Sequence, residues 1–189
     1  MIVDIHTHNA QSRAQTIDTA GIHPWHSLDA DLSVVESAVA NVDAIGEIGL
    51  DFACDVPREV QTEVFMAQLA LAERDKKAVV LHCVHAFEEV IKVLSQYHLR
   101  AVIFHGFIGS TKQAQRAVAQ GYYLSFGERT FHSPKTIEAM RSTPLSSLFV
   151  ETDESTTPIE EIYDKMAALR SVSITELMQA TEENFRRIF

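Results

Sequence analysis

The chain has 189 residues, a length that fits one domain, so we expect a single domain over residues 1–189. Its 46% hydrophobic and 22% charged residues are ordinary for a globular protein with a buried core, and no apolar run approaches the ~18 residues of a membrane helix. A net charge of −10 argues against a long basic face for nucleic acid, because Lys and Arg supply most of the affinity for phosphate.

Strand and helix patterns alternate along the whole chain. Residues 2–8 begin with β-branched side chains and predict a first strand, and a polar turn is expected at 9–16. Further strands are predicted at 17–23, 43–51, 78–81, 101–104, 122–126 and 148–150. Amphipathic helices are predicted at 27–40, 57–74, 85–97, 110–120, 133–140, 158–169 and 173–189. This alternation is typical of a parallel sheet with crossover helices.

Two histidines stand in the first predicted strand. Alternate side chains of a strand share a face, so His6 and His8 are expected to point the same way. Two imidazoles on one face can chelate a divalent ion such as zinc, manganese, iron or nickel. Two histidines at this spacing also occur as surface or hydrogen-bonded residues. The prediction of metal binding therefore depends on whether the other strands also end in possible ligands.

Residues able to bind metal also follow four later strands, and they are Glu47, His82, His105 and Asp153. In an open sheet the edge strands lie too far apart to share one small site, whereas in a barrel all strand ends ring one mouth. We therefore predict an α/β fold of the TIM-barrel-like, parallel (β/α) kind. The chain is shorter than the ~250 residues of a full barrel. About nine residues separate His8 from the next strand, too few for a crossover. We expect about seven strands, with a distorted or reduced N-terminal part.

Seven motifs occur in the order found in one family. They are His6-x-His8, Gly21-Ile22-His23-Pro24, Glu47-Ile48-Gly49-Leu50-Asp51, His82, His105-Gly106-Phe107-Ile108-Gly109, Ser125-Phe126 and Glu151-Thr152-Asp153. Together they resemble the TatD-type metal-dependent deoxyribonucleases, which belong to the amidohydrolase-like TIM barrels. The resemblance covers nearly the whole chain. The combination of Glu47-Ile48-Gly49-Leu50-Asp51 with Glu151-Thr152-Asp153 is specific, whereas each motif alone is not.

The resemblance implies a site for two divalent ions, whose identity among zinc, manganese, nickel and magnesium is open. His6, His8 and Asp153 would hold one ion, His82 and His105 the other, and Glu47 would bridge them. Such a pair activates a water molecule, and Asp153 would accept its proton, so Asp153 and Glu47 are the expected catalytic residues. The expected reaction is hydrolysis of a phosphodiester in a DNA end, a short oligonucleotide or a small phosphoester.

Three residues are candidates for binding the substrate, and they are His23, His85 and Arg129. The family's GxHP histidine lies near the site, so His23 is expected either to contact a substrate phosphate or only to cap its loop. Where the family commonly has a phosphate-binding arginine, this chain has Val84, followed by His85. His85 and Arg129 are the candidates to compensate. Asp51 is expected either to orient a ligand histidine or to be a simple turn residue.

Two alternatives stay open. The same metal pair would hydrolyse an amide or a lactone if phosphate-binding cations were absent, and a chain with a shortened N-terminal part could be a non-catalytic, metal-binding interaction protein. Cys83 follows His82 in the predicted strand and so points to the opposite face, where it is expected in the core rather than as a nucleophile. Because no secretion signal is seen, Cys54 and Cys83 are interpreted as reduced thiols, which predicts a cytoplasmic protein that does not bind membranes.

Overall fold

The computed structural model describes residues 1–9 and 12–189 of the chain and divides into two compact units. Unit 1 consists of Met1–Thr16 and His105–Phe189, and unit 2 is the continuous stretch Ile17–Phe104. Part of the predicted turn at 9–16 lies outside the described residues. That all 189 residues form one domain stays a prediction.

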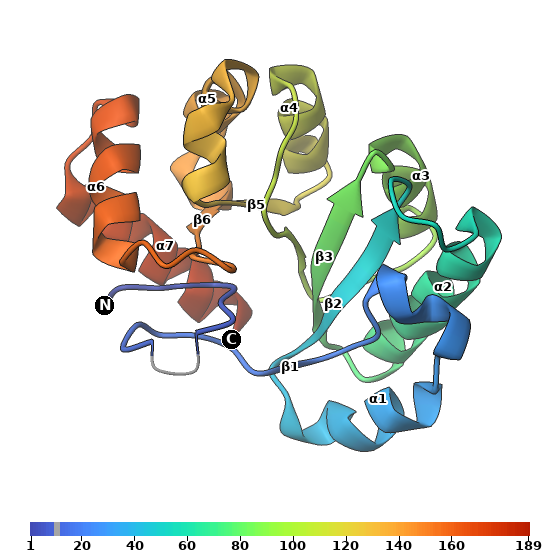
Figure 1. Cartoon of the computed structure of the whole chain (residues 1–189). Coiled ribbons are helices and arrows are strands. Elements are labelled where there is room, and N and C mark those ends of the chain that lie inside the picture. The colour runs from blue at the N-terminus through green and yellow to red at the C-terminus, as the bar shows by residue number, and fades with distance from the viewer. Residues whose placement is uncertain (10–11) are drawn as a thin grey trace. The chain divides into compact units, whose positions relative to one another are not determined.

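Unit 2 is built on four parallel strands in the order β1 (Thr19–Ala20), β2 (Ala44–Asp51), β3 (Ala78–Val84) and β4 (Val102–Phe104). Most apolar side chains of β2, β3 and β4 are buried. The helices of this unit (Figure 1) are α1 (Leu32–Ala38), α2 (Arg58–Arg74) and α3 (Phe87–Leu94). The register pairs Gly49 of β2 with His82 of β3, and this places the end of β2 beside the end of β3.

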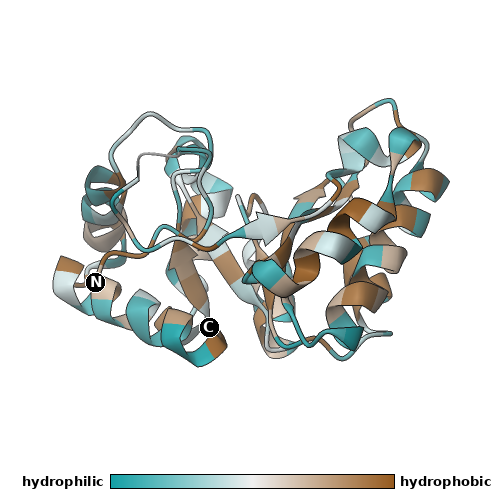
Figure 2. Cartoon of the chain, turned by 90° about the horizontal axis from the view of Figure 1, so that it is seen from below, coloured by the Kyte–Doolittle hydropathy of each residue, from teal (hydrophilic) through white to brown (hydrophobic). Residues whose placement is uncertain are grey.

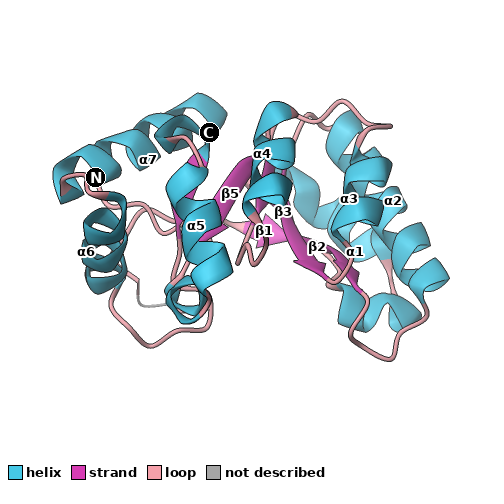
Figure 3. Ribbon diagram, turned by 90° about the horizontal axis from the view of Figure 1, so that it is seen from above, coloured by secondary structure: helices cyan, strands magenta, loops and turns pink. Residues whose placement is uncertain are grey.

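Unit 1 contains the parallel pair β5 (Tyr123–Phe126) and β6 (Leu148–Val150). Its helices, visible in Figure 3, are α4 (Thr111–Ala119), α5 (Pro134–Ser142), α6 (Ile159–Arg170) and α7 (Ile174–Ile188). Ser110 begins α4 with a capping box, and the Ser173 hydroxyl accepts a hydrogen bond from the backbone N–H of Glu176 at the start of α7.

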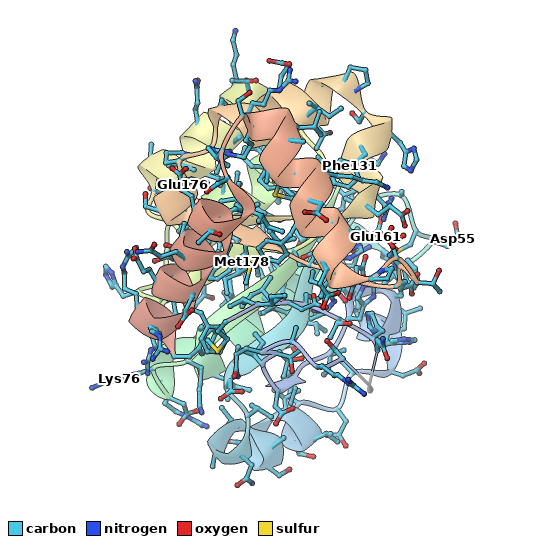
Figure 4. All side chains as sticks on the ribbon, turned by 90° about the vertical axis from the view of Figure 1, so that its left-hand side faces the viewer. Asp55, Lys76, Phe131, Glu161, Glu176 and Met178 are labelled. Atoms are coloured by element: carbon cyan, nitrogen blue, oxygen red, sulfur yellow. The ribbon has the colours of Figure 1, made fainter. Side chains whose placement is uncertain are left out.

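Four short 3₁₀ helices complete the chain: η1 (Pro24–Asp29), η2 (Val39–Asn41), η3 (Glu128–His132) and η4 (Leu145–Ser147). In unit 1, η3 lies against α6 (Figure 4), where the Lys165 ammonium sits 5.7 Å from the centroid of the Phe131 ring. This cation–π contact helps to fix η3, which carries Arg129.

The prediction of a continuous first strand at residues 2–8 is wrong. Val3 and Thr7 instead form isolated bridges, with Gln15 and Asp153 respectively. The segment changes partner along its length, because Asp4 N–H donates to Gln15 while Ile5 N–H donates to Val150. It is nevertheless extended and hydrogen-bonded beyond β6, since His8 N–H donates to the Asp153 carbonyl over 3.0 Å.

The predicted class, parallel strands alternating with amphipathic helices, is confirmed. Most helices carry both hydrophobic and hydrophilic stretches (Figure 2). Six strands occur among the described residues, close to the expected number of about seven, and β1 has only two residues. The reduction therefore falls in the N-terminal part, as the short spacing after His8 predicts.

Candidate metal centre

One cluster of possible metal ligands lies in unit 2, on the neighbouring strands β2 and β3 and the residue before η1. Glu47 comes from β2, His82 from β3, and His23 from the residue that precedes η1. Their candidate ligand atoms all lie within 4.8 Å of one another. The Glu47 Oε1 atom is 2.6 Å from His82 Nδ1 and 3.3 Å from His23 Nε2. Two ligand atoms held at about 2.0–2.2 Å from one ion are at most about 4.4 Å apart. The two distances from Glu47 Oε1 fall below this limit, so these atoms suit a divalent ion.

Behind His82 stands a second carboxylate. Asp51 Oδ2 is 3.1 Å from His82 Nε2 and accepts a hydrogen bond of 2.7 Å from the Trp25 indole N–H. Burial raises the pKa of Asp51, but the hydrogen bonds from Trp25, Ala53 and His82 outweigh it and hold that pKa below its ordinary value. Asp51 is therefore ionised and takes the position of a residue that orients a ligand histidine.

The two nitrogens of His82 thus face different groups. Ionised Asp51 can only accept, so His82 Nε2 carries a proton, and a neutral His82 then presents the Nδ1 lone pair to the Glu47 carboxylate at 2.6 Å. Two lone pairs this close repel unless a proton or a metal ion lies between them. This is the arrangement expected of a metal ligand whose other nitrogen is held by a carboxylate.

A second cluster lies in unit 1. Candidate ligand atoms of His6, His105 and Asp153 all lie within 4.8 Å of one another. His8 joins from the same segment as His6, with its Nε2 3.6 Å from Asp153 Oδ1 and its ring centroid 5.1 Å from that of His6. The expected shared orientation of His6 and His8 is thus seen. Imidazole and carboxylate donors of this kind suit zinc, manganese or nickel, and magnesium less well.

Glu151 lies next to His105 of the unit 1 cluster. Its side chain is fully buried, with Oε1 accepting a 2.6 Å hydrogen bond from the Gly106 backbone and lying 3.6 Å from His105 Nδ1. Burial alone would raise the pKa of the Glu151 carboxyl, but His105, and to a lesser degree His6 and Ser125, keep that pKa below its ordinary value. A buried carboxylate behind His105 leaves His105 Nε2 to face the cluster.

A pocket of about 200 Å³ opens beside this cluster, within unit 1. Asp153 and Arg129 both line it, together with Gly106, Ile108, Gly127, Glu128, Thr130, Glu151, Thr152, Glu154 and Ser155. Its wall is braced by Glu128, which accepts hydrogen bonds from the hydroxyls of Ser155 (2.5 Å) and Thr157 (2.8 Å). Arg129 is exposed, and among the described residues it takes part in no ion pair.

The other predicted side chains lie differently. His85 is exposed just after β3, with a left-handed backbone (φ 52°), and no hydrogen bond joins it to either cluster in the described part of the chain. Burial raises the pKa of the Cys83 thiol to about 12, which agrees with the expectation that it is no nucleophile. Of the two expectations for His23, the structure shows the cap, since its Nδ1 accepts a hydrogen bond from the Trp25 backbone N–H at the start of η1. Its Nε2 is 3.3 Å from Glu47 Oε1, and contact with a substrate phosphate stays a prediction.

Sequence reasoning missed two residues of these clusters. Glu151 stands directly after β6, two positions before Asp153, and the available signal was a carboxylate that follows a buried apolar strand. Trp25 follows the His23-Pro24 pair, but nothing in the local sequence showed that its indole reaches Asp51, 26 positions away.

The fold and the two histidine–carboxylate clusters define a parallel α/β protein equipped to bind divalent metal. The family model for the TatD-related DNases matches residues 4–189, and the chain belongs to this family. It is 33% identical to the uncharacterized metal-dependent hydrolase YabD of Bacillus subtilis, over 87% of this chain and 75% of YabD. It is 26% identical to the human deoxyribonuclease TATDN3, over 86% of this chain and 65% of TATDN3.

Solved structures agree with this assignment. The crystal structure of YjjV, a TatD homologue from Escherichia coli K12, matches with a TM-score of 0.83 and 28% identity, over 92% of this chain and 76% of YjjV. A TatD family hydrolase from Entamoeba histolytica has the same fold, with a TM-score of 0.81 at 16% identity, over 95% of this chain and 76% of that protein. These likenesses support the predicted TIM-barrel-like fold. Among the described residues, no helix is both long and apolar enough to span a bilayer.

Proposed function

We propose that this protein is a metal-dependent hydrolase that cleaves phosphodiester bonds in short nucleic acids or small phosphoesters. The observation that carries the proposal is that Asp153 of the unit 1 cluster and Arg129 line the same pocket. A guanidinium can hold a phosphate in two hydrogen bonds, and an amide or lactone substrate has no need of it. Arg129 is therefore the proposed substitute for the family arginine, whose position is Val84 in this chain.

The charge of the pocket explains why metal is required. Its lining includes Glu128, Glu151, Asp153 and Glu154, against the single cation Arg129. Without bound ions this pocket repels a phosphate, and Arg129 alone does not compensate. Divalent ions held by His6, His8, His105 and Asp153 would reverse the local charge. That Glu47 bridges two ions, with His82 as a ligand of the second, stays a prediction.

The chain's own groups have distinct proposed tasks. Bound divalent ions would supply Lewis acidity and lower the pKa of a water molecule. The Asp153 side chain is 20% exposed, so it is accessible to water and is placed to accept a proton. Arg129 binds a phosphate oxygen, and His23, whose Nε2 faces Glu47, is the proposed second phosphate contact. His85 is retained only as a peripheral candidate.

The substrate is proposed to be short or single-stranded. TATDN3 is a deoxyribonuclease by name, and a DNA end is therefore the first substrate to test. A net charge of −10 and one arginine in the pocket disfavour binding along a duplex, where several phosphates must be neutralised. Both cysteines are free thiols, which agrees with the proposed action in the cytoplasm.

The test is a cleavage assay on metal-stripped protein reloaded with Mn²⁺, Zn²⁺, Ni²⁺ or Mg²⁺, with end-labelled single-stranded DNA and bis-p-nitrophenyl phosphate as substrates. Asp153→Asn should abolish cleavage. Arg129→Ala should raise KM roughly 10–100-fold, the cost of about 1.5–3 kcal/mol for a lost charged hydrogen bond. Lys135→Ala removes an exposed cation outside the pocket and should change nothing.

Two results would contradict the proposal. One is hydrolysis of amides or lactones by the metal-loaded protein with no cleavage of any phosphodiester. The other is stoichiometric metal binding without hydrolysis of any substrate in the panel, together with a stable protein complex in a pull-down.

A further inference from the structure

His23 and His82 both lie beside Glu47 Oε1, with ring centroids 4.4 Å apart, yet the structure gives their rings different hydrogen-bond partners. Glu47 Oε1 is 3.3 Å from His23 Nε2 and 2.6 Å from His82 Nδ1. From ligand spacing alone, either histidine is a candidate metal ligand. The difference between them lies in what holds the opposite nitrogen of each ring.

Trp25 provides a donor toward each histidine. Its backbone N–H donates to His23 Nδ1 over 3.2 Å, which leaves the proton of a neutral His23 on Nε2, the atom facing Glu47. Its indole N–H donates to Asp51 Oδ2 over 2.7 Å, and the same oxygen lies 3.1 Å from His82 Nε2. The second link places the proton of His82 on Nε2 and leaves the Nδ1 lone pair facing Glu47.

The Trp25 side chain is unusual for its location. It is 57% exposed, so burial of its ring explains little of its placement. Its ring is fixed instead by the hydrogen bond to Asp51 and by an edge-on contact with His23, with centroids 4.7 Å apart. Asp51 is further fixed by the Ala53 backbone N–H, which donates to Oδ1 over 2.9 Å. The hydrogen-bonded series Trp25–Asp51–His82 is therefore fixed at Trp25 by the contact with His23 and at Asp51 by the Ala53 backbone.

We propose that Trp25 is a positioning residue that sets different roles for the two histidines beside Glu47: His82 offers Nδ1 to a divalent ion, and His23 offers Nε2–H as a hydrogen-bond donor to an anion. This inference rests on the proposed function in taking His82 as a metal ligand. It assigns His23 to substrate binding rather than to the metal.

The first experiment uses the zinc-loaded full chain, because without metal a proton would lie between His82 Nδ1 and Glu47. Long-range ¹H–¹⁵N NMR distinguishes the two neutral tautomers of each histidine, and we expect Nε2–H for both His23 and His82. Trp25→Phe removes the indole donor but keeps an aromatic ring and the backbone N–H. It should turn His82 into a mixture of tautomers and leave His23 unchanged. Leu28→Ala, at another exposed apolar side chain of η1, should alter neither.

The second experiment measures metal affinity by titration with Zn²⁺ or Mn²⁺. Loss of an outer hydrogen-bond partner of a ligand histidine weakens binding, and we expect Trp25→Phe to lower the affinity of one site roughly tenfold. Because Trp25 is the chain's one tryptophan, its fluorescence should change when metal binds to wild type, and Asp51→Asn should diminish that change. Circular dichroism confirms that each variant is folded.

The outcomes separate the two proposals. Wild-type tautomers and wild-type affinity in a folded Trp25→Phe variant would overturn the role of Trp25, even in an active phosphodiesterase. Failure of the wild type to bind any metal would instead remove the proposed function, and with it the ligand role of His82. Direct metal coordination by His23 Nε2, seen as loss of its proton signal on loading, would also overturn this inference.

Discussion

Thr152 donates two hydrogen bonds to the side chain of Asp4, one from its backbone N–H to Oδ1 and one from its hydroxyl to Oδ2, each 2.8 Å long. The two residues are 148 positions apart in the sequence and both are buried. The pair joins the segment that carries His6 and His8 to the loop that carries Asp153. It therefore holds the unit 1 cluster together without containing any of its ligands.

We predict that Asp4→Ala lowers the free energy of unfolding by roughly 1–3 kcal/mol for each Thr152 donor left buried without a partner. Urea unfolding of metal-free protein measures this change. Thr152→Ser keeps both donors and is the matched control, with an expected loss below about 1 kcal/mol. A change of less than about 0.5 kcal/mol in Asp4→Ala would show that the pair contributes little.

The same carboxylate predicts a pH dependence of stability. Burial raises the pKa of Asp4 from 3.8 to about 6, although the hydrogen bonds from Thr152 oppose this shift. The folded protein then binds the Asp4 proton more tightly than the unfolded chain does. The resulting stabilisation is complete below about pH 4 and is lost as the pH rises through 6, a change on the order of 3 kcal/mol. Comparing wild type with Asp4→Asn from pH 4 to 7, without metal, isolates this contribution, and parallel curves would contradict it.

The backbone geometry at Gly49 explains why the motif Glu47-Ile48-Gly49-Leu50-Asp51 has a glycine at this position. Its φ is +141°, and a Cβ atom added there would lie 2.0 Å from the carbonyl oxygen of His82. We predict that Gly49→Ala destabilises the protein by roughly 3 kcal/mol or more and weakens metal binding, because β2 and β3 must separate at the ligands. Denaturant unfolding and metal titration measure the two effects.

Gly121→Ala is the control for backbone strain alone. Gly121 also has a positive φ, of +80°, but a Cβ there would meet no atom within 4 Å. Its replacement should cost only about 1 kcal/mol and leave metal affinity unchanged. Equal effects of the two substitutions would show that the contact with His82 is unimportant.

Glu151→Gln tests the support behind His105. The amide preserves the size of the side chain but removes the negative charge next to His105 Nδ1. We predict a loss of roughly 10–100-fold in metal affinity at one site, measured by isothermal titration. Glu160→Gln, at an exposed carboxylate of α6 outside the pocket, serves as the charge-matched control. If both variants bind metal like wild type, Glu151 has only a packing role.

Much of this molecule could be predicted from local sequence. The helices at 57–74 and 158–169 and the strands that deliver Glu47 and His82 were visible as apolar periods with clear end signals. The groups of ligands followed from the rule that parallel strands end at one edge of a sheet. These features depend on neighbours in the chain or on a single topological rule.

The remaining features depend on partners far away in sequence. Residues 2–8 have strand-forming composition, yet their pairing is divided between Gln15 and the segment around Asp153. No period in the sequence specifies that division. The hydrogen bond from Trp25 to Asp51 is similar, since it depends on a side-chain rotamer and on the position of η1 relative to β2. Such contacts are fixed by packing rather than by propensity.

The division of the chain into units has a consequence for biosynthesis. Unit 2 is one uninterrupted stretch, Ile17–Phe104, so all of its strands and helices have left the ribosome while the rest is still being translated. Unit 1 combines Met1–Thr16 with His105–Phe189, so Asp4 can accept its hydrogen bonds only after Thr152 has been translated. His23, Glu47 and His82 can therefore come together early in translation, whereas His6 and His8 acquire their carboxylate neighbour only after Asp153 has been translated.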